Sequence, residues 1–203
     1  MSCPPRSFYR RSTEMVARSL IGKKLVRTIR KNGQAFRLAG IIVETEAYGY
    51  RDDAASHAYA GRTARNGVMF GDVGRAYVYF TYGNHFCANV SARSNRTEAG
   101  AILIRGLNPV EGIEIMRKFR PVDDLISLTS GPGKLTQALN IVSALNGLDM
   151  TDPESELHIE FGSNPAHIFG SARVGITRAT DKEWRFVDPS SPYVSRRIRI
   201  KAL

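Results

Sequence analysis

The chain has 203 residues, of which 42% are hydrophobic and 24% are charged. This length and composition favour one folded domain and exclude a disordered, histone-like tail. Its 29 Lys and Arg exceed its 19 Asp and Glu by ten. This excess of positive charge is compatible with nucleic acid, an anionic membrane or an acidic protein as partner, whereas any single basic cluster is interpreted as solvated surface. The sequence has neither an apolar run of membrane-spanning length nor a secretion signal, so we expect an intracellular protein with no membrane partner.

The first half of the chain predicts a helix followed by a hairpin. A short helix is capped by Ser12 or Thr13 and ends at Gly22. Residues 25–29 and 35–48 have the composition of strands, and an Asn-Gly pair separates them. Because Asn-Gly is a strong signal for a tight hairpin turn, we expect the two strands to pair with each other.

The second half predicts another hairpin, two helices and a region of short strands. Residues 76–91 form the hairpin, with a two-residue turn at positions 83–84. One helix is predicted over 108–121, opened by an Asn-Pro pair, and another begins after Pro132. Residues 158–200 resemble short strands and turns. The pattern predicts an α+β domain built on antiparallel strands.

Two acids stand at the end of an apolar strand. Glu44, Glu46 and Tyr48 alternate with other residues, so they share one face, with the carboxylates about 6.5 to 7 Å apart. Acids in this position are costly unless they are hydrated, paired or used in chemistry. We expect Glu44 to bind arginine at the rim of the sheet, and Glu46 to be either another arginine partner there or a functional group.

A metal site built from Glu46, Asp52 and His57 is conceivable, but the spacing fits no metal-binding motif. Cys3 and Cys87 are too few for a four-cysteine zinc site or a disulfide framework. The expectation is therefore a reduced protein without a metal.

An aromatic hairpin places three tyrosines within residues 77–82. Alternation puts Tyr77 and Tyr79 on one face and Tyr82 on the other, beside the turn. Tyr77 and Phe80 are interpreted as ordinary aromatic strand residues. Tyr82, exposed at the tip of a positively charged protein, is interpreted as a wedge or stacking platform for nucleic acid.

Residues 130–136 are rich in glycine and contain a lysine, but Leu135 stands where a phosphate loop requires Ser or Thr. Two interpretations remain. The helix that begins here either binds one DNA phosphate at its amino end or is simply capped.

Taken together, these segments resemble the alkyladenine (3-methyladenine, methylpurine) DNA glycosylase family. The resemblance spans residues 12–195. The matching segments, in the order of the family, are Val43–Tyr48, His57, Arg65-Asn66, Met69-Phe70, Tyr77–Tyr79, Tyr82-Gly83, Phe86-Cys87, Asn89, Arg105, Pro109–Gly112, Ser130–Pro132 and Lys134-Leu135.

The resemblance implies a fold and a partner. The fold is a single domain over residues 1–203, a curved, barrel-like antiparallel sheet related to the C-terminal domain of formyltransferases, with flanking helices. Whether residues 1–10 are ordered is left open. The implied partner is double-stranded DNA carrying damaged purines, bound by a monomer without a cofactor. Such a protein works in the cytoplasm, at the nucleoid, of a prokaryote or in the nucleus of a eukaryote.

The resemblance also implies catalytic roles. Glu46 activates a water molecule against C1′ of a flipped nucleotide, and Arg105 lies near the reacting sugar and phosphate. The implied reaction is monofunctional hydrolysis of the bond between an alkylated purine and its sugar. Deaminated purines remain a second lesion class.

Further residues are implied to bind the base and the DNA. Those of the base pocket are Tyr48, His57, Tyr79 and Asn89; Tyr82 enters the duplex, and Arg65, Gly131 and Lys134 contact DNA. The strict two-residue turn conflicts with one of these roles. It pairs Tyr79 with Ala88 and leaves Asn89 on the opposite face, so Asn89 needs a bulge or a strong twist to reach the pocket.

Two other function classes are compatible with the residues. A binding module for distorted nucleic acid shares the basic surface and the aromatic wedge. A carbohydrate hydrolase is suggested by the separation of Glu44 and Glu46, which falls within the about 6.5 to 9.5 Å of inverting enzymes. Acids on one strand, however, do not easily reach opposite sides of a sugar.

Overall fold

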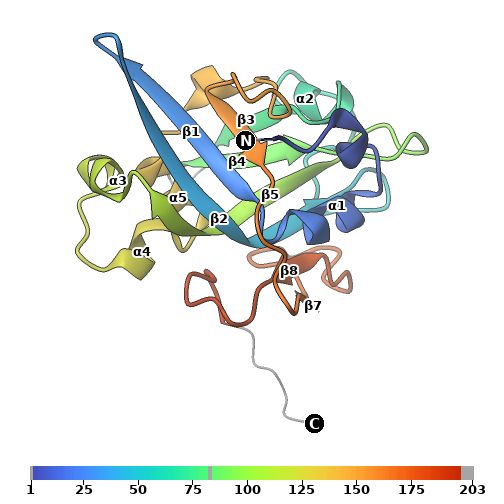
Figure 1. The fold of residues 1–203 in the computed structure, drawn as a ribbon. Coiled ribbons are helices and arrows are strands. Elements are labelled where there is room, and N and C mark those ends of the chain that lie inside the picture. Colours follow the sequence, from blue (N-terminus) through green and yellow to red (C-terminus); the bar gives the residue numbers. More distant parts are fainter. Residues whose placement is uncertain (1, 82–83, 198–203) are drawn as a thin grey trace.

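The computed structural model describes residues 2–81 and 84–197. Its strands, in chain order, are β1 (Lys24–Lys31), β2 (Gln34–Tyr48), β3 (Ala76–Phe80), β4 (Phe86–Ser91), β5 (Ala101–Glu111), β6 (Leu157–Glu160), β7 (Phe169–Ser171) and β8 (Arg185–Val187). They form one antiparallel sheet in the order β3, β4, β5, β2, β1, β6, with β8 paired to β2 and β7 paired to β8. The sheet curls into a half-barrel (Figure 1), which confirms the predicted α+β fold.

Helices flank the curled sheet. In the described residues they are α1 (Thr13–Leu20), α2 (Gly67–Phe70), α3 (Ile113–Phe119), α4 (Leu125–Thr129) and α5 (Pro132–Ala138), with 3-10 turns at Arg6–Tyr9 and Ser143–Leu145. Helix α1 lies at one end of the sheet and α3 to α5 gather at the other (Figure 1). The helices predicted after Ser12 and after Pro132 are confirmed, whereas α2 and α4 had no predicted counterpart.

The first hairpin forms as its sequence predicts. Strands β1 and β2 pair from Lys24 with Ile41 to Lys31 with Gln34, so two residues connect them. Both take left-handed conformations, with φ of 51° at Asn32 and 75° at Gly33. Asn and Gly are the residues that tolerate such angles, which is why the Asn-Gly signal was reliable.

The second hairpin forms with a different register. Phe80 pairs with Phe86 and Tyr79 pairs with Cys87, so the connection has five residues and the predicted two-residue turn is wrong. The correction changes the face on which Asn89 lies. Tyr77 now pairs directly with Asn89, and the Asn89 side chain therefore shares the face of Tyr77 and Tyr79 without a bulge in this strand pair.

The helix predicted at Asn108 is wrong at its start. Strand β5 continues through Asn108 and Pro109 to Glu111, and α3 begins only after Gly112. Pro109 lies opposite Gly40 where the pairing with β2 shifts register, a position that tolerates a missing amide donor. Pairing along the long strand β2 therefore outweighs the local Asn-Pro signal.

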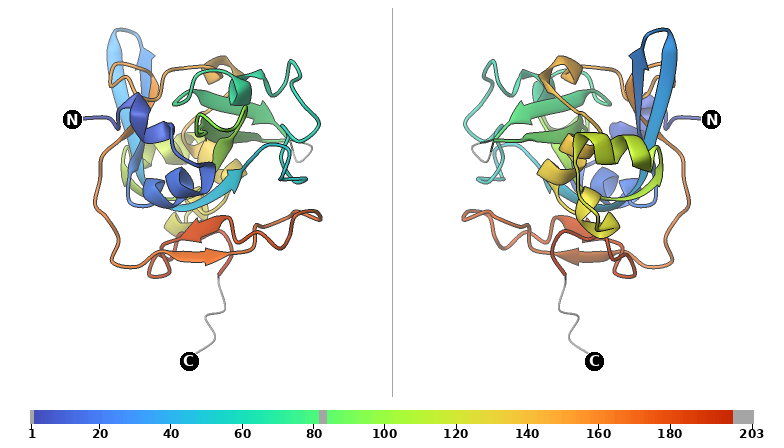
Figure 2. Two further views of the ribbon diagram at one scale, coloured as in Figure 1. Left: turned by 90° about the vertical axis from the view of Figure 1, so that its right-hand side faces the viewer. Right: turned by 90° about the vertical axis from the view of Figure 1, so that its left-hand side faces the viewer.

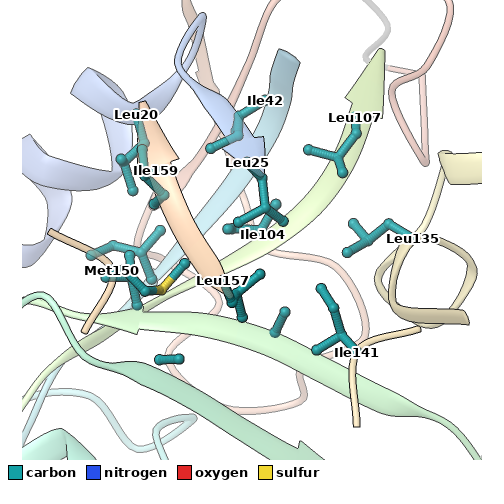
Figure 3. Packing of buried hydrophobic residues seen from close by; sticks show 14 of the residues in the cluster. Leu20, Leu25, Ile42, Ile104, Leu107, Leu135, Ile141, Met150, Leu157 and Ile159 are labelled. Atoms are coloured by element: carbon teal, nitrogen blue, oxygen red, sulfur yellow. The ribbon is translucent and has the colours of Figure 1, made fainter. Parts of the chain in front are cut away.

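The hydrophobic core fills the concave side of the sheet. Side chains from α1, β1, β2, β5, α5 and β6 meet there, as Figure 3 shows for Leu20, Leu25, Ile42, Leu107 and Leu135 among others. The N-terminal segment contributes too, because Tyr9, the last residue of the first 3-10 turn, is fully buried. Within this segment Pro4 and Tyr9 are buried against the body.

The last third of the chain adds a short layer to this body. Strands β7 and β8 lie along one side of it (Figure 2), and β8 pairs with the end of β2 from Glu44 to Glu46. The region of short strands and turns predicted for residues 158–200 is confirmed over its described part. In the described residues, no helix is both long and apolar enough to cross a membrane.

Candidate active site

A cavity of about 420 Å³, counted with its open mouth, lies beside the end of β2 and the face of the second hairpin. Its lining is mostly aromatic and apolar: Tyr48, Ala55, His57, Met69, Tyr77, Tyr79, Asn89, Ala101 and Ile176. These residues come from β2, β3, β4, β5, α2 and two loops. A concave, apolar site with a few polar groups is typical of a small-molecule or base pocket.

The predicted pocket residues Tyr48, His57, Tyr79 and Asn89 all line this cavity. The rings of His57 and Tyr79 meet edge to face, with centroids 4.6 Å apart. Asn89 is buried and donates from Nδ2 to the carbonyl oxygen of Tyr77, 2.8 Å away. The corrected hairpin register thus places Asn89 where the two-residue turn could not.

Tyr77 also lines the cavity, although its sequence context predicted an ordinary aromatic strand residue. Its hydroxyl lies 3.0 Å from Nδ1 of His57, and its ring centroid lies 5.1 Å from that of Tyr79. The alternation that placed Tyr77 and Tyr79 on one face was the signal that could have identified it. Met69, Ala55, Ala101 and Ile176 carried no comparable signal, because they reach the cavity from separate segments.

The cavity holds its titratable groups in their neutral forms. Partial burial of the His57 ring, helped by the positive charge of Arg65, lowers the pKa of His57 below its usual 6.5, so the imidazole is mainly neutral at pH 7. Burial raises the pKa of Tyr77 to about 12 and raises those of Tyr48 and Tyr79 further. The tyrosines therefore remain hydrogen-bond donors at neutral pH.

Glu46 lies directly behind the Tyr48 wall and is fully buried. Its Oε2 accepts hydrogen bonds from the Tyr48 hydroxyl at 2.8 Å and from Nη1 of Arg105 at 3.2 Å. Its Oε1 accepts from the backbone amide of Val174 at 2.6 Å. All three partners donate, as the lone pairs of an ionised carboxylate require.

Glu44 binds arginine, as predicted, but deep inside the protein. Its Oε1 accepts from Nε of Arg105 at 3.0 Å and from Nε of Arg185 at 2.7 Å, and its Oε2 accepts from the backbone amide of Ser195 at 2.5 Å. Arg105 therefore bridges Glu44 and Glu46. Burial alone would lower the pKa of Arg105, but the two carboxylates outweigh it and raise that pKa. A guanidinium between the acids leaves no place for a sugar there, which disfavours the carbohydrate hydrolase interpretation.

The predicted DNA-contact residues lie outside the cavity. Arg65 is exposed, donates to the carbonyl oxygen of Phe80 and lies with its guanidinium 5.3 Å from the Tyr79 ring centroid. Gly131 and Lys134 lie at the start of α5, where a Cβ on neighbouring Gly133 would meet the His85 ring. That contact brings α5 beside the hairpin connection. Tyr82 falls outside the described residues.

The metal ligands considered from sequence do not assemble. Asp52 is exposed and pairs with Lys182, whose Nζ lies 3.2 Å from the carboxylate. In residues 2–81 and 84–197, no three His, Cys, Asp or Glu side chains are grouped to hold a metal ion.

Comparison with known proteins shows the family. The family model described as "Methylpurine-DNA glycosylase (MPG)" matches residues 7–192. A protein of Koribacter versatilis is 46% identical over 94% of this chain and 92% of its own length. One of Prosthecochloris aestuarii is 47% identical over 94% and 90%, and one of Methanoculleus marisnigri 46% over 95% and 98%. All three carry the name "Putative 3-methyladenine DNA glycosylase". From this match along almost its whole length, the chain belongs to the methylpurine-DNA glycosylase family.

Proposed function

We propose that this protein is a monofunctional DNA N-glycosylase that flips an alkylated purine into the aromatic cavity and hydrolyses the bond between base and sugar. The observation that carries the proposal is the contact between Tyr48 and Glu46. It connects a pocket wall suited to a flat base with a buried carboxylate suited to activating water. The substrate is double-stranded DNA, bound by a monomer in the cytoplasm of a prokaryote or in the nucleus of a eukaryote.

The cavity supports binding of a flipped base. Extruding a nucleotide from the duplex costs a few kcal/mol, and stacking on aromatic rings offsets part of that cost. Tyr48, Tyr79 and His57 supply the rings. Because His57 is neutral at pH 7, it adds no charge that would repel a cationic alkylated purine. Asn89 places an amide in the same pocket for contact with the edge of the base.

Glu46 acts as the general base. Among the described residues, its Oε1 accepts one hydrogen bond, from Val174, so a second lone pair of this oxygen is the position for a water molecule. Removing a proton from that water directs its oxygen at C1′ as the purine departs. Arg105 and the carboxylate together stabilise the charges that develop on the phosphate and the sugar.

The test is base release from methylated DNA by Glu46→Gln. This variant keeps the size and the acceptor oxygen of the side chain but loses its basicity, so we expect release to fall by roughly 100-fold or more. Binding to a duplex carrying the lesion should change little. Release at the wild-type rate would contradict the role of Glu46, and a wild-type protein that binds the lesion but frees no purine would indicate a binding module. Duplexes with 3-methyladenine, ethenoadenine or hypoxanthine then define the lesion range.

A further inference from the structure

A second buried ion pair lies behind the pocket, between residues that the proposed chemistry does not use. Arg173 and Asp53 have fully buried side chains. Nη1 of Arg173 donates to Oδ2 of Asp53 at 2.7 Å, and Nη2 donates to Oδ1 at 2.6 Å. This two-pronged geometry fixes the plane of the guanidinium as well as its position.

The guanidinium supports the Tyr48 wall from outside the cavity. Its central carbon lies 4.8 Å from the Tyr48 ring centroid, and Nη1 also donates to the carbonyl oxygen of Ala47 at 2.9 Å. Tyr48 lines the cavity and Arg173 does not. A cation over an aromatic face is attracted to it, so the pair restrains the ring whose hydroxyl bonds to Glu46.

The same pair joins two loops that both contribute residues to the cavity. Asp53 accepts from the backbone amides of Gly49 and Ala55 at 2.9 and 3.3 Å, within the loop that carries Ala55 and His57 to the cavity. Arg173 immediately precedes Val174, whose amide holds Oε1 of Glu46.

We propose that Asp53 and Arg173 are positioning residues that set the Tyr48 ring and the Val174 amide, and through them the reactive geometry of Glu46. The inference rests on the proposed glycosylase function. The pair touches neither the base nor the reacting atoms, so its effect falls on the rate of base release rather than on DNA binding. Small misplacements of catalytic groups cost as much as roughly 100-fold in rate.

The test replaces both partners together, because removing only one would leave an unpaired buried charge and destabilise the protein for that reason alone. The double variant Asp53→Asn/Arg173→Met is compared with the wild type for single-turnover base release, affinity for undamaged duplex and thermal unfolding. The matched control is Asp52→Asn/Lys182→Met. It removes the neighbouring pair of the exposed Asp52 and the partly exposed Lys182, whose amino group lies over Trp184 and not over Tyr48.

We expect base release to slow by roughly 10- to 100-fold in the double variant, at temperatures where it is fully folded, with its duplex affinity unchanged. The control should release base at the wild-type rate. If the double variant does not fold, Arg173→Lys replaces it, since lysine keeps the charge but not the two-pronged contact, and the same slowing is expected. A folded variant as fast as the control overturns the positioning role alone. A wild-type protein that frees no purine overturns the proposed function, and the positioning role with it.

Discussion

At the scale of single residues, burial sets the protonation states of His57 and of the tyrosines in the site. Burial keeps the imidazole of His57 neutral and the tyrosines protonated, whereas Glu46 is surrounded by donors. The cavity is thus lined by neutral rings, with one buried carboxylate behind the Tyr48 wall. Such a lining suits the flat, cationic base of the proposed function, because it adds no positive charge that would repel it.

The pKa of His57 tests whether burial keeps its imidazole neutral. We expect its imidazole to titrate below 6.5, and Arg65→Ala to raise its pKa without restoring 6.5, because burial is the larger cause of the shift. Ring-proton NMR over pH 4 to 8 measures both. Since the folded state disfavours the protonated form, stability is lost as the pH falls below 6.5 and is unaffected by this group at higher pH. A midpoint at or above 6.5 in the wild type would contradict the burial argument, and Lys134→Ala serves as the control.

Residue positions could be predicted from the sequence where neighbouring residues along one strand place the side chains. Glu44, Glu46 and Tyr48 alternate along one strand, and the structure keeps them on one side, where Arg105 bridges the two acids. Arg173 and Ile176 could not be found in this way. They reach the site through the fold of a late loop, and no local spacing relates them to β2.

At the scale of elements, local sequence signals predicted the tight turn of the first hairpin correctly. They failed where pairing between long strands, or a longer connection, determined the structure. The Asn-Gly turn specified the first hairpin, but the Gly-Asn pair of the second lies within a longer connection. The helix predicted at Asn108, where strand β5 continues instead, is the other prediction that failed. The pairing of β5 with β2 carries the chain through Asn108 and Pro109 as a strand and delays the helix to Gly112.

The junction at Gly112 can be tested by substitution. Its φ is 73°, and an added Cβ would lie 2.6 Å from the carbonyl oxygen of Arg37, so Gly112→Ala combines backbone strain with a backbone clash. We expect a loss of roughly 2 kcal/mol or more in the free energy of unfolding. Gly33→Ala is the matched control. It has φ of 75° but nothing within 4 Å of the added carbon, so it should lose only about 1 kcal/mol. Urea unfolding of both proteins measures the difference, and equal losses would contradict the clash.

At the scale of the whole molecule, the fold determines where the cavity lies, and the net charge determines how the protein interacts with a charged partner. The half-barrel and its helices position the aromatic cavity, while the formal charge of +10 belongs to the chain as a whole. The fold class could be predicted from the family resemblance and the strand pattern. Composition alone could not have specified the curl of the sheet, because the curl depends on pairing between strands distant in sequence.

The charge predicts how DNA binding responds to salt. Affinity for an undamaged duplex should fall steeply, by roughly 1000-fold between 50 and 200 mM salt if about six phosphates are neutralised. Arg65→Ala and Lys134→Ala should each reduce the slope of log affinity against log salt by about 1. Fluorescence anisotropy with a labelled duplex measures the slope. A flat response would show that phosphate contacts do not dominate, and slopes unchanged in both variants would remove these two residues from the contact surface.

The bonds that surround Glu44 and Glu46 have a consequence for synthesis of the protein. Glu46 accepts from an amide 128 positions later in the chain, and Glu44 from one 151 positions later. During translation both acids leave the ribosome long before the groups that bind them. Products that terminate before Val174 would thus contain both acids yet lack the Val174 and Ser195 amides that hold them.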